Sequence, residues 1–371
     1  MKLVVQKSII FKALSHVQSI VEKKNTLPIL SNILIEAKDN NIVLSSTDMD
    51  ISITETINCN TVENGSTTVN ASTLFDIIRK LSDTKEIEII ANDGKILSIR
   101  SGSSRFSLGC LPKEDFPLIE IGNSDIKIKI DSQHFLKLIE KTKFAISNEE
   151  TRYFLNGLYF NLRNEENEKF ITIVGTDGHR LSKIDYQNEN LTDDSIGVII
   201  PKKTINELSK LLSEFNGEIE INLTSNKIIF FINNSILISK LIDGNFPDYK
   251  RVIPQDNNNI LKVNRISLAE AVDRVSTINS EKLPIVKFKL LNNLMNISTS
   301  NNENGTATED IETEYTGEEI EIGFNSKYVL DMVNNLEEEN ISLGFKDNSS
   351  PITATEKSNP NLIYVLMPMR I

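Results

Sequence analysis

Apolar and polar positions follow one order in three places along the chain. An alternating apolar run predicts a strand, a short turn follows, and apolar residues then recur at the spacing of an amphipathic helix. The three stretches are residues 68–81, 199–212 and 323–336. Leu81, Leu212 and Leu336 close the predicted helices, roughly one third of the 371 residues apart. A repeat of this length indicates a duplicated domain rather than the unit of a solenoid, which has about 20–50 residues.

A second set of segments has nearly the same spacing. Residues 5–14, 130–139 and 263–272 each start with an apolar residue and continue with apolar residues at helical spacing. Two independent sets predict three similar domains, which we place at residues 1–123, 124–255 and 256–371. The joins fall in turn-rich stretches, and each segment has a common domain size of about 120 residues.

The predicted strands alternate between apolar and polar residues, as in residues 33–37, 51–55, 86–90 and 127–130. Such alternation is typical of antiparallel sheets with one buried and one solvated face. Two helices and several strands per repeat predict an α+β fold, with the helices on one side of the sheets. The acidic run Glu337–Glu339 is interpreted as a solvated helix end.

Charge is distributed unevenly. The net charge is −12, and residues 256–371 contain 10 Lys and Arg against 18 Asp and Glu. The only cysteines are Cys59 and Cys110, so a disulfide framework is not expected. The N-terminus lacks a long apolar run, and no stretch approaches the ~18 apolar residues of a membrane span. These features predict a reduced, cytoplasmic protein that does not insert into membranes.

Candidate catalytic chemistry is confined to Thr176–Leu181. Asp177 and His179 could form an acid–base pair of a hydrolase or two metal ligands, or they could belong to a tight Asp-Gly turn. Phosphate-binding glycine loops and a Gly-x-Ser-x-Gly motif are missing, and cysteine spacing for zinc is absent. The turn is therefore favoured over catalysis.

Two further features suggest binding surfaces. The terminal stretch Tyr364–Ile371 is almost wholly apolar, which predicts either a last core strand, at Tyr364–Leu366 above all, or part of a binding groove. Its methionines suit a groove that accepts different partners. Several Lys and Arg residues lie on the predicted helices, including Lys202 and Lys203. If these helices share one side, that side could hold a phosphate backbone without sequence preference.

Short motifs in a fixed order resemble those of the bacterial DNA polymerase III beta subunit family, the sliding clamps. The resemblance runs from end to end of the chain. The motifs are residues 26–30, 46–48, 105–108, 115–117, 152–157, 176–181, 245–252 and 367–370.

The resemblance implies a DNA clamp fold in a ring-shaped, head-to-tail homodimer, with helices lining a central hole and sheets outside. Its function would be to encircle duplex DNA without sequence specificity. It would then tether the polymerase III catalytic subunit, the clamp loader and other clamp-binding proteins, conferring processivity. No catalytic activity, cofactor or metal is implied. The alternatives are a hydrolase using Asp177 and His179, or a scaffold of repeated domains that never meets DNA.

The resemblance also implies roles for individual residues. DNA-facing positions are Lys24, Arg152, Tyr153, Phe154, Lys202 and Lys203. The dimer interface would contain Phe106, Leu108, Thr277 and Ile278. A pocket for short partner peptides, typically with a Gln and a Leu-Phe-like apolar end, would be formed by Leu155, Thr176, Gly178, His179, Arg180, Leu181, Pro247, Arg251, Val252, Asn325, Tyr328, Met367, Pro368, Met369 and Arg370.

Overall fold

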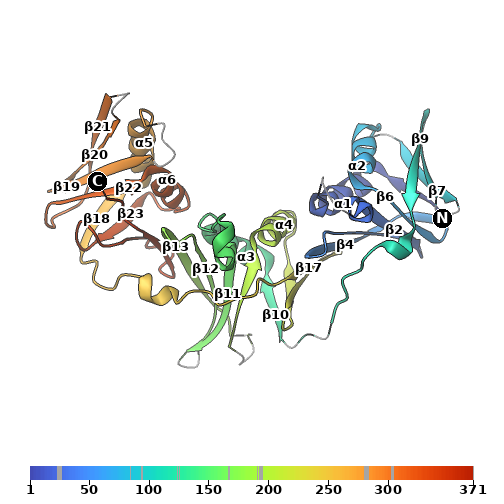
Figure 1. The fold of residues 1–371 in the computed structure, drawn as a ribbon, viewed down its shortest axis with the longest axis horizontal. Coiled ribbons are helices and arrows are strands. Elements are labelled where there is room, and N and C mark those ends of the chain that lie inside the picture. Colours follow the sequence, from blue (N-terminus) through green and yellow to red (C-terminus); the bar gives the residue numbers. More distant parts are fainter. Residues whose placement is uncertain are drawn as a thin grey trace. The chain divides into compact units, whose positions relative to one another are not determined.

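The computed structural model describes residues 1–22, 27–83, 85–92, 95–122, 124, 126–165, 168–189, 191, 195–279, 284–301 and 305–370. Figure 1 shows the chain as a ribbon coloured along its sequence. The chain forms two compact units. The first comprises Met1–Leu136 with Lys203–Leu241, and the second comprises Lys137–Lys202 with Ile242–Ile371. Residues of the predicted segment 124–255 therefore occur in both units.

The order of strand and helix that the sequence predicts is confirmed in all three repeats. One set of pairs is β1 (Lys2–Gln6) with α1 (Lys7–Ile20), β10 (Ile126–Asp131) with α3 (Ser132–Lys143), and β18 (Asn259–Asn264) with α5 (Arg265–Ser276). The other is β6 (Gly65–Asn70) with α2 (Ala71–Lys80), β14 (Ile196–Pro201) with α4 (Lys202–Ser213), and β22 (Ile320–Asn325) with α6 (Ser326–Asn334).

Short polar side chains set the start of several helices. Asn70, Asn264 and Asn325 each accept a hydrogen bond from a backbone N–H in the first turn of α2, α5 and α6. Asp131 does the same for two N–H groups of α3. These caps satisfy donors that a helix end leaves without partners, so each strand passes directly into its helix.

In the first unit, thirteen described strands form one antiparallel sheet in the order β10-β15-β16-β17-β4-β3-β2-β6-β9-β8-β7-β1-β5. The strands not yet given are β2 (Asn32–Lys38), β3 (Asn41–Thr47), β4 (Ile51–Asn58), β5 (Asn60–Glu63), β7 (Glu86–Asn92), β8 (Ile96–Ser101), β9 (Ser104–Leu111), β15 (Glu218–Leu223), β16 (Lys227–Ile232) and β17 (Ser235–Lys240). Helices α1 and α2 pack together and bury Ile10, Leu14 and Ile78 (Figure 1).

The pairing of β17 with β4 joins the first repeat to part of the second within this unit. Ser235 lies opposite Glu55, and Ser239 lies opposite Ile51. This pairing continues the sheet across the predicted boundary and explains why one compact unit contains residues of both segments.

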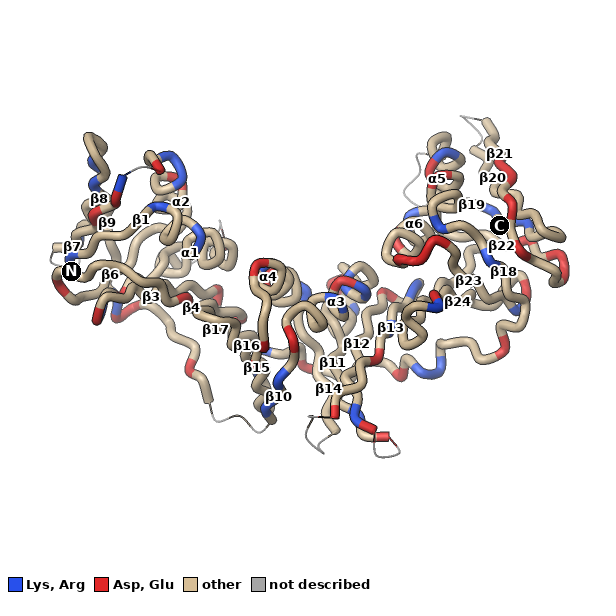
Figure 2. The backbone as a smooth tube through the Cα atoms, turned by 180° about the vertical axis from the view of Figure 1, so that it is seen from behind, with Lys and Arg blue, Asp and Glu red and all other residues tan. Residues whose placement is uncertain are grey.

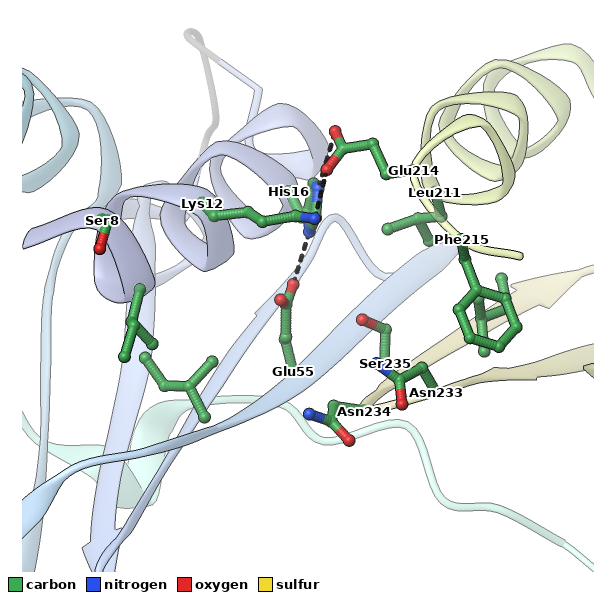
Figure 3. Close-up of a pocket in the computed structure, with 13 residues that line it drawn as sticks. Ser8, Lys12, His16, Glu55, Leu211, Glu214, Phe215, Asn233, Asn234 and Ser235 are labelled. Atoms are coloured by element: carbon green, nitrogen blue, oxygen red, sulfur yellow. Dashed lines mark hydrogen bonds and ion pairs between the residues drawn. The ribbon is translucent and has the colours of Figure 1, made fainter. Parts of the chain in front are cut away.

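A charged cluster lies beside the pairing of β17 with β4 (Figure 3). Nδ1 of His16 is 2.7 Å from Oε2 of Glu55, and Nε2 is 3.3 Å from Oε1 of Glu214. Lys12 pairs with the other oxygen of Glu214 at 2.8 Å. Both ring nitrogens of His16 therefore face carboxylate oxygens, an arrangement that favours the protonated imidazolium over the neutral ring. The cluster lines a cavity of about 330 Å³ together with Asn233 and Phe215.

We expect His16 to make the free energy of unfolding depend on pH. Burial alone would lower the pKa of His16, but Glu55 and Glu214 outweigh it and raise the pKa above its ordinary value. The stabilisation is therefore complete below the unfolded pKa of about 6.5 and is lost as pH rises through the folded pKa. His16→Gln should cost about 1.5–3 kcal/mol at pH 6 and less at pH 9.

The measurement is the free energy of unfolding of the wild-type protein and of the His16→Gln variant between about pH 6 and pH 9. His134→Gln, at a histidine whose side chain is 62% exposed, is the control. A cost of His16→Gln that is constant with pH would contradict this role.

The second unit contains an eight-stranded and a four-stranded antiparallel sheet among its described residues. Their orders are β14-β11-β12-β13-β25-β24-β23-β18 and β21-β20-β19-β22. The remaining bounds are β11 (Gly157–Glu165), β12 (Glu168–Thr176), β13 (Arg180–Gln187), β19 (Ile285–Leu291), β20 (Leu294–Asn301), β21 (Gly305–Glu312), β23 (Asn340–Phe345), β24 (Ile352–Thr355) and β25 (Leu362–Leu366).

The acidic run Glu337–Glu339 follows the end of α6, where Glu337 and Glu339 are exposed, as the interpretation of a solvated helix end expects. Two of its side chains nevertheless have specific partners. Glu337 forms ion pairs with Lys137 at 3.0 Å and Lys141 at 2.9 Å. Glu338 accepts hydrogen bonds from the backbone N–H groups of Lys357 and Ser358. In the part of the chain that the structure describes, no helix is long and apolar enough to cross a membrane.

Candidate functional site

The turn between β12 and β13 forms the centre of the candidate site, in the second unit. Oδ1 of Asp177 accepts hydrogen bonds from the N–H groups of His179, at 2.9 Å, and Arg180, at 3.0 Å. Thr176 donates to the carbonyl of Arg180 at 2.6 Å. Gly178 has a φ of 87°, and a Cβ there would lie 2.6 Å from Nη1 of Arg152. Asp177 therefore builds the turn, as the Asp-Gly interpretation expects.

Arg180 ties this turn to distant segments. Its guanidinium pairs with Asp177 at 3.1 Å and Asp331 at 2.5 Å, and donates to the carbonyl of Phe144 at 2.7 Å. It also lies over the rings of Phe144 and Tyr328, 5.3 and 4.3 Å from the centroids. The planar, forked guanidinium can stack and form these hydrogen bonds together, so a lysine could not replace it.

The terminal segment Met367–Arg370 lies between the turn and β22. The N–H of Met367 donates to the carbonyl of His179 at 2.9 Å, and the N–H of Met369 donates to the carbonyl of Gly323 at 2.8 Å. The rings of His179 and Tyr328 lie 6.3 Å apart and nearly parallel. Burial raises the pKa of Tyr328. Asn325 is buried at the start of α6, where it caps the helix.

A buried apolar cluster forms the base of this region. It contains Val174, Leu181, Tyr249 and Val365, and Tyr159, Phe246 and Ile253 pack against it. Phe246 and Tyr159 stack in parallel with their centroids 4.7 Å apart. These contacts fix the linker segment, residues 246–253, so that Pro247, Arg251 and Val252 remain exposed at its surface. Leu155 is buried at the end of a 3-10 helix, Glu150–Leu155.

Arg370 contacts a different feature. It lines a cavity of about 440 Å³ with residues of β19, β20 and β21, among them Lys287, Ser298 and Thr308. The other predicted pocket residues do not line this cavity. The structure thus brings together the turn, the terminal segment and the start of α6, whereas Arg370 points to a neighbouring surface.

The predicted DNA-facing residues occur in both units. In the second unit, Arg152 pairs with Glu149 at 2.7 Å, Tyr153 is 54% exposed, and its ring meets that of Phe154 edge to face. Lys202 donates to Oδ1 of Asn148 at 2.7 Å. In the first unit, Lys203 forms ion pairs with Asp48 and Glu22. Lys24 lies outside the described residues.

The predicted interface residues lie on one strand of the first unit and directly after one helix of the second unit. Phe106, 37% exposed, and the half-buried Leu108 belong to β9 in the first unit. Thr277 and Ile278 follow α5 in the second unit. Among the described pairings, β9 contacts β6 only at Cys110 and Leu111, so Ser104–Gly109 leave one strand edge open.

Sequence reasoning missed several residues that hold the site in place. Phe144 and Asp331 position Arg180, while Phe246 and Tyr249 fix the linker segment. A signal existed only for Phe246 and Tyr249, which lie within the motif at residues 245–252. Phe144 and Asp331 are far from Arg180 in sequence, and only the fold brings them together.

Three α+β repeats of antiparallel sheet and helix define a clamp-type fold, and the candidate site combines a turn, a linker and the terminal segment. Three family models match consecutive parts of the chain: the DNA polymerase III beta subunit N-terminal domain at residues 1–120, the central domain at 129–248 and the C-terminal domain at 250–370.

Relatives match over the whole length. The chain is 40% identical to the Beta sliding clamp of Caulobacter vibrioides (strain NA1000 / CB15N) and 34% identical to that of Escherichia coli (strain K12), with 100% of both chains covered in each case. A sliding clamp (DNA polymerase III subunit beta) from Bartonella birtlesii bound to griselimycin superposes with a TM-score of 0.97 at 40% identity and full coverage of both chains.

A beta sliding clamp structure from C. crescentus, with PEG bound to a putative beta-motif tethering region, gives a TM-score of 0.96 at 40% identity. It covers 100% of this chain and 99% of that chain. The chain belongs to the DNA polymerase III beta subunit family, the bacterial β sliding clamps. It has the three-domain DNA clamp fold and the sliding-clamp function of a non-catalytic processivity subunit in DNA replication. The hydrolase alternative is therefore wrong.

Proposed function

We propose that two copies of this chain close head to tail into a ring around duplex DNA in the cytoplasm. The observation that carries this proposal is the pair of open strand edges in the first and last repeats. Along Ser104–Gly109, β9 pairs only with β8, and among the described residues β21 pairs only with β20. Exposed edges tend to recruit further strands, and pairing β9 of one copy with β21 of the other would cover both.

Charge and symmetry support the same arrangement. β9 carries Arg105, whereas acidic residues follow one another along β21 (Figure 2). Of these, Glu309 already pairs with Arg274 at 2.6 Å, which leaves Asp310 and Glu312 as the acids that could face Arg105. A head-to-tail contact of this kind forms a closed assembly if the rotation between copies is twofold. The ring would hold DNA by enclosing it, so an acidic chain with a net charge of −12 would not need a high affinity for the duplex.

We further propose that the turn Thr176–Leu181, the linker segment and the terminal segment bind short peptides of the polymerase catalytic subunit, the clamp loader and other replication and repair proteins. The apolar cluster around Leu181 and Val365 supports an apolar peptide end. Exposed polar groups beside it, including His179 and Arg251, support recognition of a polar side chain such as Gln.

Solution mass and DNA retention test the ring. We expect a mass of about twice 41.8 kDa by light scattering through dilution to micromolar concentration. Clamps placed on nicked circular DNA by a clamp loader should stay bound and should be released when the circle is cut. A monomer throughout the dilution series, or equal retention on cut and circular DNA, would overturn the proposal.

A further inference from the structure

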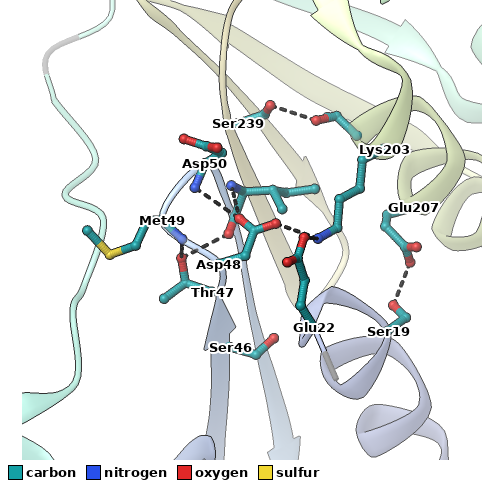
Figure 4. A network of polar contacts seen from close by, with 12 residues as sticks. Ser19, Glu22, Ser46, Thr47, Asp48, Met49, Asp50, Lys203, Glu207 and Ser239 are labelled. Carbon is teal, nitrogen blue, oxygen red and sulfur yellow. Dashed lines mark hydrogen bonds and ion pairs between the residues drawn. The ribbon is translucent and has the colours of Figure 1, made fainter. Parts of the chain in front are cut away.

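Two adjacent lysines begin α4, and their side chains have different partners. The ammonium group of Lys203 lies between two carboxylates of the first unit, Asp48 and Glu22 (Figure 4). Its distance to Oε1 of Glu22 is 3.1 Å. The Lys203 side chain is only 38% exposed and that of Asp48 only 8%. The charge of Lys203 is therefore already compensated within the chain.

Asp48 is fixed by the turn in which it lies, Thr47–Ile51. Its Oδ1 accepts hydrogen bonds from the N–H groups of Asp50, at 2.9 Å, and Ile51, at 2.8 Å (Figure 4). Met49 in the same turn has a φ of 81°, a conformation that a non-glycine residue holds only with support. If Lys203 moved to a DNA phosphate, it would leave a nearly buried carboxylate without its cation, which is strongly unfavourable.

Neighbouring contacts show that Lys203 belongs to a structural joint. Ser19 of α1 donates to Glu207 of α4 at 2.5 Å, and Thr204 lies 2.6 Å from the hydroxyl of Ser239. Lys240 pairs with Asp50 at 3.1 Å. Together with Lys203, these contacts hold the Thr47–Ile51 turn and the end of α1 against α4.

Lys202, in the second unit, has a different environment. Its Nζ donates to Oδ1 of Asn148 at 2.7 Å, and this partner is a neutral amide. No carboxylate forms an ion pair with it among the residues that the structure describes. Partial burial, and then the charge of Arg180, lower the pKa of Lys202, which is the expected effect where no anion stabilises a cation.

We propose that Lys203 is a positioning residue that holds the Thr47–Ile51 turn and α1 against α4, and that Lys202 alone of this pair supplies a contact to the DNA backbone. The inference rests on the proposed encirclement of DNA. It differs from the resemblance, which implies a DNA-facing role for both lysines.

Salt dependence of DNA binding distinguishes the two roles. A lysine that neutralises one phosphate contributes about 0.9 to the slope of log K against log salt concentration. For the full-length dimer and a short fluorescent duplex, Lys202→Gln should reduce the slope by about that amount. Lys203→Gln should leave the slope unchanged and lower the thermal midpoint by about 2–4 °C. Lys203→Arg, which keeps the charge, should restore the midpoint.

Glu22→Gln is a second variant that spares the buried Asp48. Asp48 still pairs with Lys203 when this exposed carboxylate is removed, so Lys203→Gln should leave the slope unchanged in the Glu22→Gln background as well. Equal loss of slope from Lys202→Gln and Lys203→Gln, with no change in midpoint for the latter, would overturn the inference. The inference would also be overturned if Lys202→Gln kept the salt slope of the wild type. Failure of the wild-type dimer to be retained on circular DNA would instead contradict the proposed function.

Discussion

A dimer carrying Phe106→Asp is expected to dissociate into monomers of 41.8 kDa and to be lost from circular DNA. Phe106 lies on the open part of β9, and the proposed interface would bury its side chain against the last repeat. A carboxylate there would lose its hydration beside the acids of β21. An unpaired charge buried in this way costs about 3–5 kcal/mol. The proposed ring contains two such interfaces, so this cost applies twice, and the dimer dissociation constant should rise about 10,000-fold or more.

Val62→Asp is the matched control for this variant. Val62 is also an exposed apolar residue of the same sheet, but it lies on β5, the last strand in the order, with β8, β7 and β1 between it and β9. Sedimentation or light scattering over a concentration series measures the dissociation constants, and circular dichroism checks that both variants fold. Wild-type dimerisation by Phe106→Asp would place the interface elsewhere.

Local patterns explain why the repeats could be predicted. The apolar patterns of β2, β4 and β7 and the helical spacing in α1 and α2 are properties of a few adjacent residues, and the structure confirms these strands and helices. Buried and less buried positions alternate along β7, whereas Asn32–Ile35 of β2 are buried on both faces, so the expected solvated face is missing there. Asparagine caps such as Asn70 also act over three or four residues. The limits of the compact units depend instead on the pairing of β17 with β4, between segments far apart in the chain.

The candidate site shows the same division between local and distant contacts. The turn Thr176–Leu181 could be predicted because Asp177 and Gly178 encode it locally. The role of Arg180 could not, because its partner Asp331 is 151 residues away. Likewise, the sequence presents Lys202 and Lys203 as an equivalent basic pair. Only the fold brings Asp48, 155 residues away, to Lys203 and makes the two lysines different.

Removal of Met367–Ile371 should abolish peptide binding while leaving the dimer intact. Truncation after Leu366 retains β25, whose buried Tyr364, Val365 and Leu366 complete the sheet. It removes the two backbone hydrogen bonds through which the terminal segment contacts His179 and Gly323. It also removes the side chains of Met367 and Met369. Loss of such central contacts costs about 2 kcal/mol or more each, so affinity should fall at least about 100-fold.

Calorimetry with a synthetic peptide that carries a Gln and a Leu-Phe end measures this loss. A shorter deletion, of Arg370 and Ile371 alone, is the matched control because it spares the hydrogen bonds of both Met367 and Met369. We expect this control to retain most of the affinity, since Arg370 lines the separate cavity beside β19–β21. Normal binding by the longer truncation would exclude the terminal segment from the site, and complete loss in both would assign recognition to Arg370. Light scattering of the truncated protein should still give the dimer mass, because β9 and β21 are unchanged.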